Sequence, residues 1–525
     1  MQMKVKNLIG RTAACSHPLV SALKGSVLKV HMGILPEGRV FAGTTATRSG
    51  ARNGRVNSLS SGKRCLSGVP FRVSEELPHL PVRIDGVADR KMDFDDAARA
   101  FASQSSLELT RSLAIFAACG VRPLVTNAGN IYKVSTQALG HTVPDSVIRA
   151  SFFRHFCGGE SESEVITFMK RLDANGIGAI LDYAAEADVA SEPSGDHHEH
   201  VCDGNAKIVM SSINAAAAAA ATSRSGREPF AACKFTGIGQ PELLERLSTI
   251  LNGIKTSSAL FDANIDGKVM QALSKAEQDK YLRLTARANR LAKYAADKGV
   301  KLLIDAEQTY FQTAIDHMAL SLMLRYNKER PVVFNTYQCY LKDAVARVQG
   351  HMQSANQLAF VFAAKAVRGA YMVQERRLAL ERGYPNPIHD SKQSTHACYD
   401  TVVDVILSSK VAAAADVRAR AAAVMIASHN EQSIIKGIRR MQELKLEAKQ
   451  GVYFAQLQGM CDHVSFSLGQ DGFAVYKYLP YGPVNEVMPY LLRRLEENSD
   501  VMGVVGKQRS MIWGELKRRM LSSLA

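Results

Sequence analysis

The chain has 525 residues, of which 46% are hydrophobic, 22% charged and 7% aromatic, and this composition excludes a mostly disordered or collagen-like protein. Its net charge of +15 is concentrated at one end: residues 1–70 hold eleven lysines and arginines against one acid, whereas the rest has 54 basic and 49 acidic side chains. A nearly neutral body argues against nucleic-acid binding. No apolar run reaches the ~18–20 residues of a membrane-spanning helix, and nine cysteines without a C-x-x-C pair are typical of a reducing compartment.

The first 70 residues are predicted to be a targeting segment. They are rich in Arg, Lys, Ser, Gly and Ala, contain Glu37 as their one acid, and lack the apolar core of a secretory signal. This composition is typical of a mitochondrial transit peptide. Arg64-Cys65-Leu66-Ser67 resembles a site for a matrix peptidase that cleaves after Leu66. The alternative is a basic tail without a targeting role.

Residues 71–175 are predicted to be a linker followed by an N-terminal helical region. Prolines punctuate the linker, whereas from about residue 93 to 174 apolar residues recur at helical spacing between polar breaks. Asp95 and Asp96 are expected in the first turn of one of these helices, where acidic side chains are favourable.

From Gly176 onward, short β-rich or apolar runs alternate with stretches long enough for a helix. Eight strand–helix alternations over about 310 residues predict a (β/α)8 barrel, and the barrel with its C-terminal helix is assigned to residues 176–525. The predicted strands are 176–183, 230–236, 300–306, 332–337, 360–367, 422–428, 452–457 and 473–479.

Polar side chains gather near the carboxyl ends of these predicted strands. In a (β/α)8 barrel this end carries the chemistry, whereas a random scatter would place about half of them at the other end. The residues are Lys234, Asp305, Asn335, Arg368, His429, Asn430 and Tyr478.

Two segments are expected to lie outside the core. Residues 185–204 include Asp196-His-His-Glu-His200, which could bind a metal, but a polar surface loop is favoured. The seven alanines at 215–221 form a helix readily and stand beside a flexible Ser-Arg-Ser-Gly stretch.

A further motif begins like a calcium-binding loop. Asp262, Asn264 and Asp266 stand at positions 1, 3 and 5, and Gly267 stands at position 6. Position 12 is Leu273 where a bidentate Glu is needed, so we predict a turn and no metal site.

One helical face follows the last predicted strand. Tyr490, Arg493, Arg494 and Glu497 stand at i, i+3, i+4 and i+7, so they share a side of the helix. A polar face of this kind is usually solvated. Two adjacent guanidinium groups at a barrel mouth would instead bind a carboxylate bidentately.

From about residue 93 to 500 the chain resembles the eukaryotic mitochondrial proline dehydrogenase (proline oxidase) family. The resemblance implies a distorted (β/α)8 barrel with an N-terminal helical region and a final helix over the flavin site. The matching stretches, in order and at barrel spacing, are 180–186, 234–237, 303–307, 334–342, 365–371, 427–430, 456–461 and 478–498.

The resemblance implies FAD as cofactor and assigns residues to it. Lys365 would lie near the reactive ring and Arg368 at the phosphates. His429 and Asn430 would hold the pyrophosphate side, and Asn335 the isoalloxazine edge. Gln456, displaced by one position from the family pattern, and Glu497 complete the implied cofactor-binding set.

The resemblance also implies a substrate site for L-proline. Asp305 would anchor its neighbours, and Glu186 would pair with Arg493 as an ion-pair gate. A tyrosine at position 478 would pack near carbon 4 of the substrate ring and disfavour a 4-hydroxyl group. The residues implied to hold the substrate are Lys234, Tyr371, Leu457, Tyr478, Tyr490, Arg493 and Arg494.

The implied reaction is oxidation of L-proline to 1-pyrroline-5-carboxylate, with hydride transfer to FAD and electrons passed to ubiquinone. It implies a mitochondrial protein on the matrix side of the inner membrane, associated with it peripherally. Alternatives are a hydroxyproline dehydrogenase on the same fold, a non-catalytic barrel scaffold, and a phosphate-handling barrel lyase. The lyase would need a Gly-rich phosphate loop after strands seven and eight, where glycine is sparse.

Overall fold

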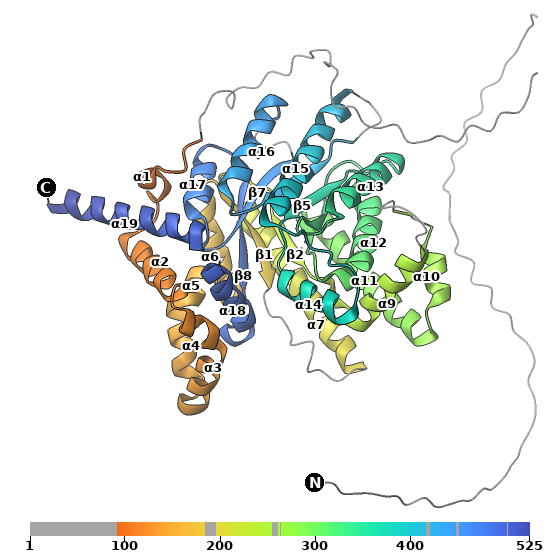
Figure 1. Cartoon of the computed structure of the whole chain (residues 1–525), viewed down its shortest axis with the longest axis horizontal. Helices are drawn as coiled ribbons and strands as arrows, with labels where there is room; N and C mark the ends of the chain where they lie inside the picture. Colours follow the sequence, from red (N-terminus) through yellow and green to blue (C-terminus); the bar gives the residue numbers. More distant parts are fainter. Residues whose placement is uncertain are drawn as a thin grey trace, which may run out of the picture. The chain divides into compact units, whose positions relative to one another are not determined.

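The computed structural model describes residues 92–183, 196–254, 261–262, 264–415, 420–447, 451–500 and 502–524. Eight parallel strands close into a barrel in chain order (Figure 1). Ile180 on β1 lies opposite Phe230 on β2 and Tyr478 on β8, which closes the ring. The predicted (β/α)8 barrel is confirmed, with strand ends that differ from the predicted ones by at most three residues. The strands are β1 (Ile177–Tyr183), β2 (Phe230–Cys233), β3 (Lys301–Ile304), β4 (Val333–Gln338), β5 (Ala363–Val367), β6 (Ala423–Ala427), β7 (Val452–Leu457) and β8 (Val475–Tyr481).

Helices between the strands form the outer layer of the barrel (Figure 1). Helix α11 shows how local sequence sets their limits: Ser274 and Glu277 form a reciprocal capping box at its start, and Gly299 ends it in the left-handed conformation. The helices after β1 to β7 are α7 (Asp196–Ala221), α8 (Phe235–Ile238), α9 (Pro241–Ile254), α10 (Asp266–Ala272), α11 (Lys275–Lys298), α12 (Thr309–Tyr326), α13 (Ala344–Gln357), α14 (Met372–Arg382), α15 (Lys392–Ala415), α16 (Glu431–Glu443) and α17 (Asp462–Gln470).

Aromatic rings fill the barrel interior near the amino-terminal ends of the strands. Phe230, Phe334, Tyr453 and Tyr476 pack edge to face, with ring centroids 4.8 to 5.9 Å apart. Aliphatic inward-facing side chains such as Leu303 complete this aromatic plug. Because side chains alternate between the two faces of a strand, the plug also identifies which positions nearer the carboxyl ends point inward.

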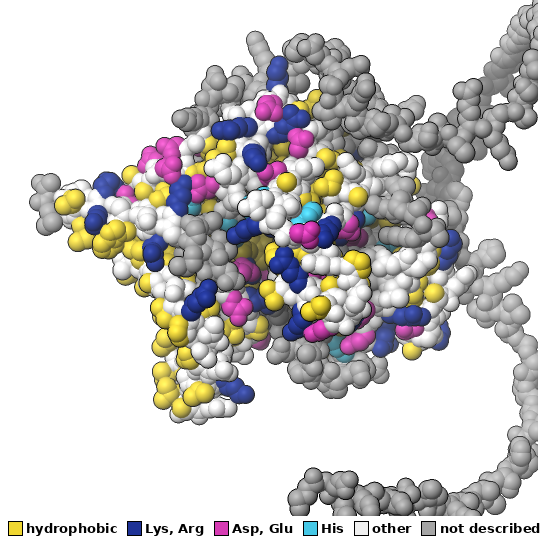
Figure 2. Space-filling view, viewed as in Figure 1, with side chains coloured by type: hydrophobic (Ala, Val, Ile, Leu, Met, Phe, Trp, Pro, Cys, Tyr) yellow, Lys and Arg dark blue, Asp and Glu magenta, His cyan; other side chains and the backbone are white. Residues whose placement is uncertain are grey.

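The N-terminal helices pack with the two C-terminal helices rather than alone. Figure 1 shows α2–α5 and α19 on the same side of the barrel, and Figure 2 shows apolar side chains on their surface. One cluster joins Ile115 and Phe156 to Val487 and Leu491, and another joins Phe101 and Phe116 to Ile512. These elements are α1 (Ala97–Ala100), α2 (Ser106–Cys119), α3 (Arg122–Leu139), α4 (Thr142–Ile148), the π-helical turn Arg149–Phe153, α5 (Arg154–Phe156), α6 (Glu162–Asp173), α18 (Val484–Asp500) and α19 (Met502–Leu524).

Two predictions, a surface loop at 185–204 and an alanine run outside the core, are wrong where the structure describes them: residues 196–221 form helix α7, whereas 185–195 lie outside the described residues. The histidine-rich stretch begins this helix, and Glu199 is buried in an ion pair with Arg287, with 2.6 Å between Oε2 and Nη2. Ala215 and Ala216 are fully buried in the main core. The alanines therefore form a thin helix face that lies close against the barrel.

The remaining local predictions have mixed outcomes. Asp262 accepts a hydrogen bond from the backbone N–H of Asn264 at 2.8 Å, which confirms the turn. Asp96 is the N-cap residue of α1, one position outside its first turn. Among the described residues no group of three or more His, Cys, Asp or Glu side chains is arranged to hold a metal ion. The predicted targeting segment lies outside the described residues.

Candidate active site

Two lysines and two aspartates, each on or directly after one of four strands, meet above the aromatic plug. Lys365 of β5 donates from Nζ to Asp305 Oδ1, directly after β3. Lys234, directly after β2, donates from Nζ to Asp182 Oδ2 of β1 at 3.4 Å. Asp182, Lys234 and Asp305 lie at the carboxyl ends of their strands, and Lys365 lies in the middle of β5. All four face inward, like the plug residues on the same strands. The strands therefore present alternating negative and positive groups to the barrel mouth.

Tyr478 of β8 links these groups. Its hydroxyl donates to Asp305 Oδ2 at 2.7 Å, and Lys365 Nζ lies 5.3 Å from the centre of its ring. Burial, with the nearby carboxylates of Asp182 and Asp305, raises the pKa of Tyr478 well above its usual value. The phenol therefore keeps its proton and remains a donor to Asp305.

Asp305 is ionised although it is buried. Burial alone would raise the pKa of Asp305, but the positive charges of Lys365 and Lys234 outweigh it and hold that pKa below its usual value. The two lysines thus keep a carboxylate at the floor of the mouth.

Arg368, directly after β5, occupies the corner between β5 and β6. It donates to Ser428 Oγ at 2.6 Å and to Ser433 Oγ at 2.9 Å, and its guanidinium lies 4.4 Å from the ring centre of Tyr399. Asn430 is the N-cap residue of α16 and accepts from the backbone N–H of Ser433 at 3.1 Å. A guanidinium beside the positive end of a helix is a donor set suited to phosphate.

His429 stands next to this corner as a neutral imidazole. Its Nε2 accepts a hydrogen bond from the backbone N–H of Leu457 at 3.0 Å, which leaves the proton on Nδ1. Burial, followed by the charges of Lys477 and Arg494, lowers the pKa of His429 to about 3.

Helix α18 brings its polar face into the protein. Tyr490 and Arg494 are only 4% and 7% exposed, so the usual solvated face is excluded here. Arg494 stacks over the ring of Tyr490 at 5.0 Å and donates to Glu497, and Arg493 on the same side is partly exposed. Tyr490 Oη is buried and has no hydrogen-bond partner among the described residues.

Two predicted cofactor residues lie outside the barrel interior. Phe334 belongs to the plug, so its neighbour Asn335 lies on the outer face of β4 and donates to Asp316 Oδ1 of α12 at 2.8 Å. Gln456 lies on the outer face of β7, where its Oε1 accepts from Ser465 Oγ of α17 at 2.9 Å. The structure therefore does not bring these two side chains together with Lys365.

Other site residues stand where the strands end. Tyr371 is the N-cap residue of α14, shortly after β5, and Leu457 ends β7. Glu186, the predicted partner of Arg493, lies outside the described residues.

The sequence reasoning missed two buried carboxylates. Asp182 binds Lys234, and Glu307 accepts from both the backbone N–H and the hydroxyl of Thr236. The rule that selected Asp305, a polar residue at the carboxyl end of a strand, would also have selected Asp182.

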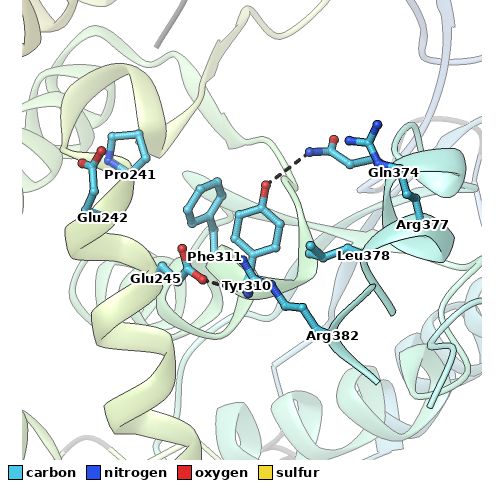
Figure 3. A pocket seen from close by; sticks show the side chains of 9 residues that line it. All are labelled: Pro241, Glu242, Glu245, Tyr310, Phe311, Gln374, Arg377, Leu378 and Arg382. Atoms are coloured by element: carbon cyan, nitrogen blue, oxygen red, sulfur yellow. Dashed lines mark hydrogen bonds and ion pairs between the residues drawn. The ribbon is translucent and has the colours of Figure 1, made fainter. Parts of the chain in front are cut away.

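A separate hollow of about 270 Å³ lies between α9, α12 and α14 (Figure 3). Arg382 reaches across it to Glu245 at 3.1 Å, and Gln374 donates to the hydroxyl of Tyr310 at 3.4 Å. It is lined by none of the predicted site residues, so the site is defined by the side chains at the barrel mouth.

Comparisons with known proteins identify the family of the chain. A family model described as "Proline dehydrogenase" matches residues 165–507. The chain is 32% identical to "Proline dehydrogenase 1, mitochondrial" of Caenorhabditis elegans, covering 90% of this chain and 96% of the relative. It is 31% identical to the Homo sapiens protein of the same name, covering 82% and 90%. It is also 33% identical to "Hydroxyproline dehydrogenase" of Xenopus laevis, covering 89% and 99%.

Solved structures support the fold. A crystal structure of proline utilization A from Bdellovibrio bacteriovorus, inactivated by N-propargylglycine, superposes with a TM-score of 0.54 at 18% identity. The superposition covers 77% of this chain and 38% of that one.

The names of the relatives confirm the predicted mitochondrial localisation. From its sequence match and its barrel, the chain belongs to the proline dehydrogenase family.

Proposed function

We propose that this chain oxidises L-proline to 1-pyrroline-5-carboxylate with FAD as its resident cofactor. The observation that carries the proposal is the group formed by Lys365, Asp305 and Tyr478, which faces inward at the barrel mouth. FAD supplies the hydride acceptor when it is bound. The barrel supplies binding and orientation, and oriented reactants account for much of the rate in such reactions.

The donor groups at the mouth fit a flavin dinucleotide. Arg368, together with the start of α16 at His429 and Asn430, offers positive charge for the phosphates. Lys365 offers a buried ammonium for the ring system, held in place by Asp305. We assign Asn335 and Gln456 to positioning, because each binds a helix of the outer layer, and Glu497 to holding Arg494.

The substrate carboxylate is proposed to bind beneath α18. Arg493 and Arg494, with Lys234 across the mouth, supply its positive partners. The buried, unpartnered hydroxyl of Tyr490 supplies a further donor. A cationic pocket also disfavours the ammonium form of the substrate, so that the amine loses its proton before hydride leaves. Glu186 is proposed to pair with Arg493 as a gate.

The remaining contacts concern the substrate ring. Tyr371 and Leu457, at the ends of β5 and β7, are proposed to line it. Tyr478 is proposed to decide between proline and hydroxyproline, both of which occur in the names of the relatives. The phenolic proton of Tyr478 is already donated to Asp305, so Tyr478 has no proton left to donate to a 4-hydroxyl group of the substrate. Burying an unpaired hydroxyl costs about 1–3 kcal/mol in proteins, in addition to the steric cost.

Electron transfer and location complete the proposal. Ubiquinone is proposed as the final acceptor, which requires peripheral contact with the inner membrane from the matrix side. Residues 1–70 are proposed as the transit segment, 71–175 as linker and helical region, and 176–525 as the FAD-binding barrel with its C-terminal helix.

Absorbance and steady-state kinetics test this proposal. Purified protein should show flavin absorbance that bleaches anaerobically on addition of L-proline, with a higher kcat/KM for proline than for hydroxyproline. Tyr478→Ser should shift this ratio toward hydroxyproline. A colourless protein that takes up no added FAD would support the scaffold or the lyase instead. A wild type that uses hydroxyproline equally well would refute the role of Tyr478.

A further inference from the structure

An apolar surface lies on the two helices that project beside the barrel. Five large aliphatic side chains of α3 and α4 are about half exposed or more, and only Val125 of α3 is buried. We call them the α3–α4 face: Ile131 (49% exposed), Val134 (63%), Leu139 (61%), Val143 (52%) and Val147 (61%). Isolated exposed aliphatic residues are normal, but a group of this kind on neighbouring elements marks an interaction site.

Helix α19 continues the exposed apolar surface. Trp513, Met520 and Leu521 are 56%, 65% and 68% exposed. Lys517 Nζ lies 5.4 Å from the centre of the Trp513 ring. Figure 2 shows apolar side chains along the edge formed by α3 and α4 and along α19. An exposed Trp flanked by Lys and Arg is the composition of helices that lie at a membrane surface.

The charge of these elements favours an anionic partner. Residues 122–154 contain four Lys or Arg and one acid, and residues 502–524 contain five and one. The acid of the first stretch, Asp145, is engaged by the hydroxyl of Tyr132 at 2.7 Å and by His141 at 3.7 Å. The acid of the second, Glu515, is paired with Arg518 and Arg519. Arg149 is paired with Glu160 and Glu164, and Lys507 with Asp95 and Glu431. The excess of positive charge beside the apolar surface is therefore that of the exposed basic residues Arg122, Lys133, Arg154, Arg509 and Lys517.

The packing of α2 shows which side of this region is turned inward. Leu109 and Phe116 of α2 are buried with Ile512 and Leu516 of α19. Among the described residues no single helix is long and apolar enough to cross a membrane; α2 and α3 pass that test only as a pair, bent by 96° at their junction. The other large apolar side chains of α2 are buried or partly buried, but Leu107 is 76% exposed. The apolar side chains of this region that are available for contact are therefore Leu107, Val121, the α3–α4 face and those of α19.

We propose that the α3–α4 face and the exposed side of α19 form the contact surface with anionic phospholipid membranes. This inference rests on the proposed function, because electron transfer to a membrane quinone requires contact between the protein and the membrane. The aliphatic side chains and Trp513 would enter the interface between headgroups and acyl chains. Lys133, Arg122 and Lys517 would lie at the headgroups, where each basic residue near an anionic surface strengthens binding.

Trp513 allows a direct measurement, because it is the single tryptophan of the chain. Full-length protein is mixed with vesicles of phosphatidylcholine and phosphatidylglycerol, and then with vesicles of phosphatidylcholine alone. With the anionic vesicles we expect a blue shift of the emission and quenching by lipids brominated near the headgroup. Unchanged emission on vesicles that carry the protein in flotation would exclude α19 from the surface.

Substitutions test the α3–α4 face. Val134→Asp/Val143→Asp/Val147→Asp should lower vesicle partitioning by at least about tenfold. Val134→Ser/Val143→Ser/Val147→Ser should lower it less and guards against a folding effect. The matched control is Val373→Asp/Leu380→Asp on α14, at sites 83% and 85% exposed, which should partition as wild type. Lys133→Gln/Lys517→Gln should weaken binding to the anionic vesicles only.

Two outcomes would overturn the proposal. The first is equal flotation of the α3–α4 variants and wild type. The second is wild-type protein that fails to float and dimerises through this face, as judged by sedimentation, because the occupant would then be a second copy. Proline oxidation with a soluble dye acceptor is measured in parallel. Wild-type protein that binds vesicles but does not oxidise proline would refute the proposed function and would not affect the assignment of the membrane-contact surface.

Discussion

Replacement of Lys365 by Met tests whether the buried ion pair at the barrel mouth holds the fold as well as the site. In the native protein Lys365 Nζ donates to Asp305, and both side chains are almost completely buried. The variant leaves the carboxylate of Asp305, which is only 8% exposed, without this partner. Removing one member of a buried pair costs about 3–5 kcal/mol. Because Tyr478 and Lys234 still act on Asp305, we expect the lower end, about 3 kcal/mol.

The pH dependence of this loss has a definite sign. In wild type the pKa of Asp305 is held below its usual value, so the pair stabilises the protein above the unfolded pKa of about 3.9 and this contribution disappears as the pH falls. Without Lys365, burial dominates and raises the pKa of Asp305, so the native variant takes up a proton more readily. The difference between wild type and variant should therefore be large at neutral pH and shrink on acidification.

Urea unfolding followed by circular dichroism gives the free energies for a double-mutant cycle. Lys365→Met/Asp305→Asn removes the uncompensated charge and should recover much of the stability lost in Lys365→Met. Flavin content, measured on the same samples, should fall in every variant that lacks Lys365. The reasoning would be refuted if Lys365→Met lowered the free energy of unfolding by less than about 1 kcal/mol at every pH, with the effects of the two substitutions additive in the double variant.

Three further predictions follow from the described contacts. Arg494→Met should raise the KM for proline by about tenfold or more with flavin content little changed, since a hydrogen bond to a charged group contributes about 1.5–3 kcal/mol; unchanged kinetics would refute the carboxylate site. Burial lowers the pKa of His155 to about 4, so as the pH falls this histidine takes up a proton in the unfolded chain before it does so in the folded protein. The free energy of unfolding should therefore decrease by about 2 kcal/mol between pH 8 and pH 5. His155→Gln should reduce this pH dependence in urea titrations at the two pH values, and an equal dependence in the variant would contradict the prediction. Arg287→Met should cost about 3–5 kcal/mol because it strands the buried Glu199, and thermal melts beside Arg287→Met/Glu199→Gln should show partial recovery.

The barrel could be predicted from the sequence because its signal is repeated. Eight apolar runs separated by helix-sized stretches admit few topologies, and a parallel barrel places all carboxyl ends together. The ends of short strands were less well predicted: β2 stops at Cys233 because Lys234 already caps α8. The alanine run was misjudged because its burial comes from contacts with distant elements, which local composition does not contain.

Some of the predicted site residues lie together in the structure, whereas others point away from them. Asp305 and Tyr478 were selected by their positions at predicted strand ends and Lys365 by the family resemblance, and the three lie together in the structure. Asn335, selected by the same positional rule, and Gln456, implied by the resemblance, point to the helix layer because each is shifted by one residue from an inward position. Which alternate residues of a strand face the barrel interior depends on which side chains fill that interior. This orientation can be assigned only once the aromatic plug is known.

The aromatic plug makes the barrel a cup closed at its base. Phe230, Phe334, Tyr453 and Tyr476 fill the interior below the charged layer, so a small molecule exchanges with solvent only on the side covered by α18. The loops that enter β2 and β4, at 222–229 and 327–332, stand at the closed base. The exposed residues Lys328 and Glu329 are separated from the chemistry by a packed layer of rings, which makes them suitable attachment points for labels. Asn327, which is buried and bonds to the strand backbone, and Glu228, which accepts from the hydroxyl of Tyr453, are unsuitable.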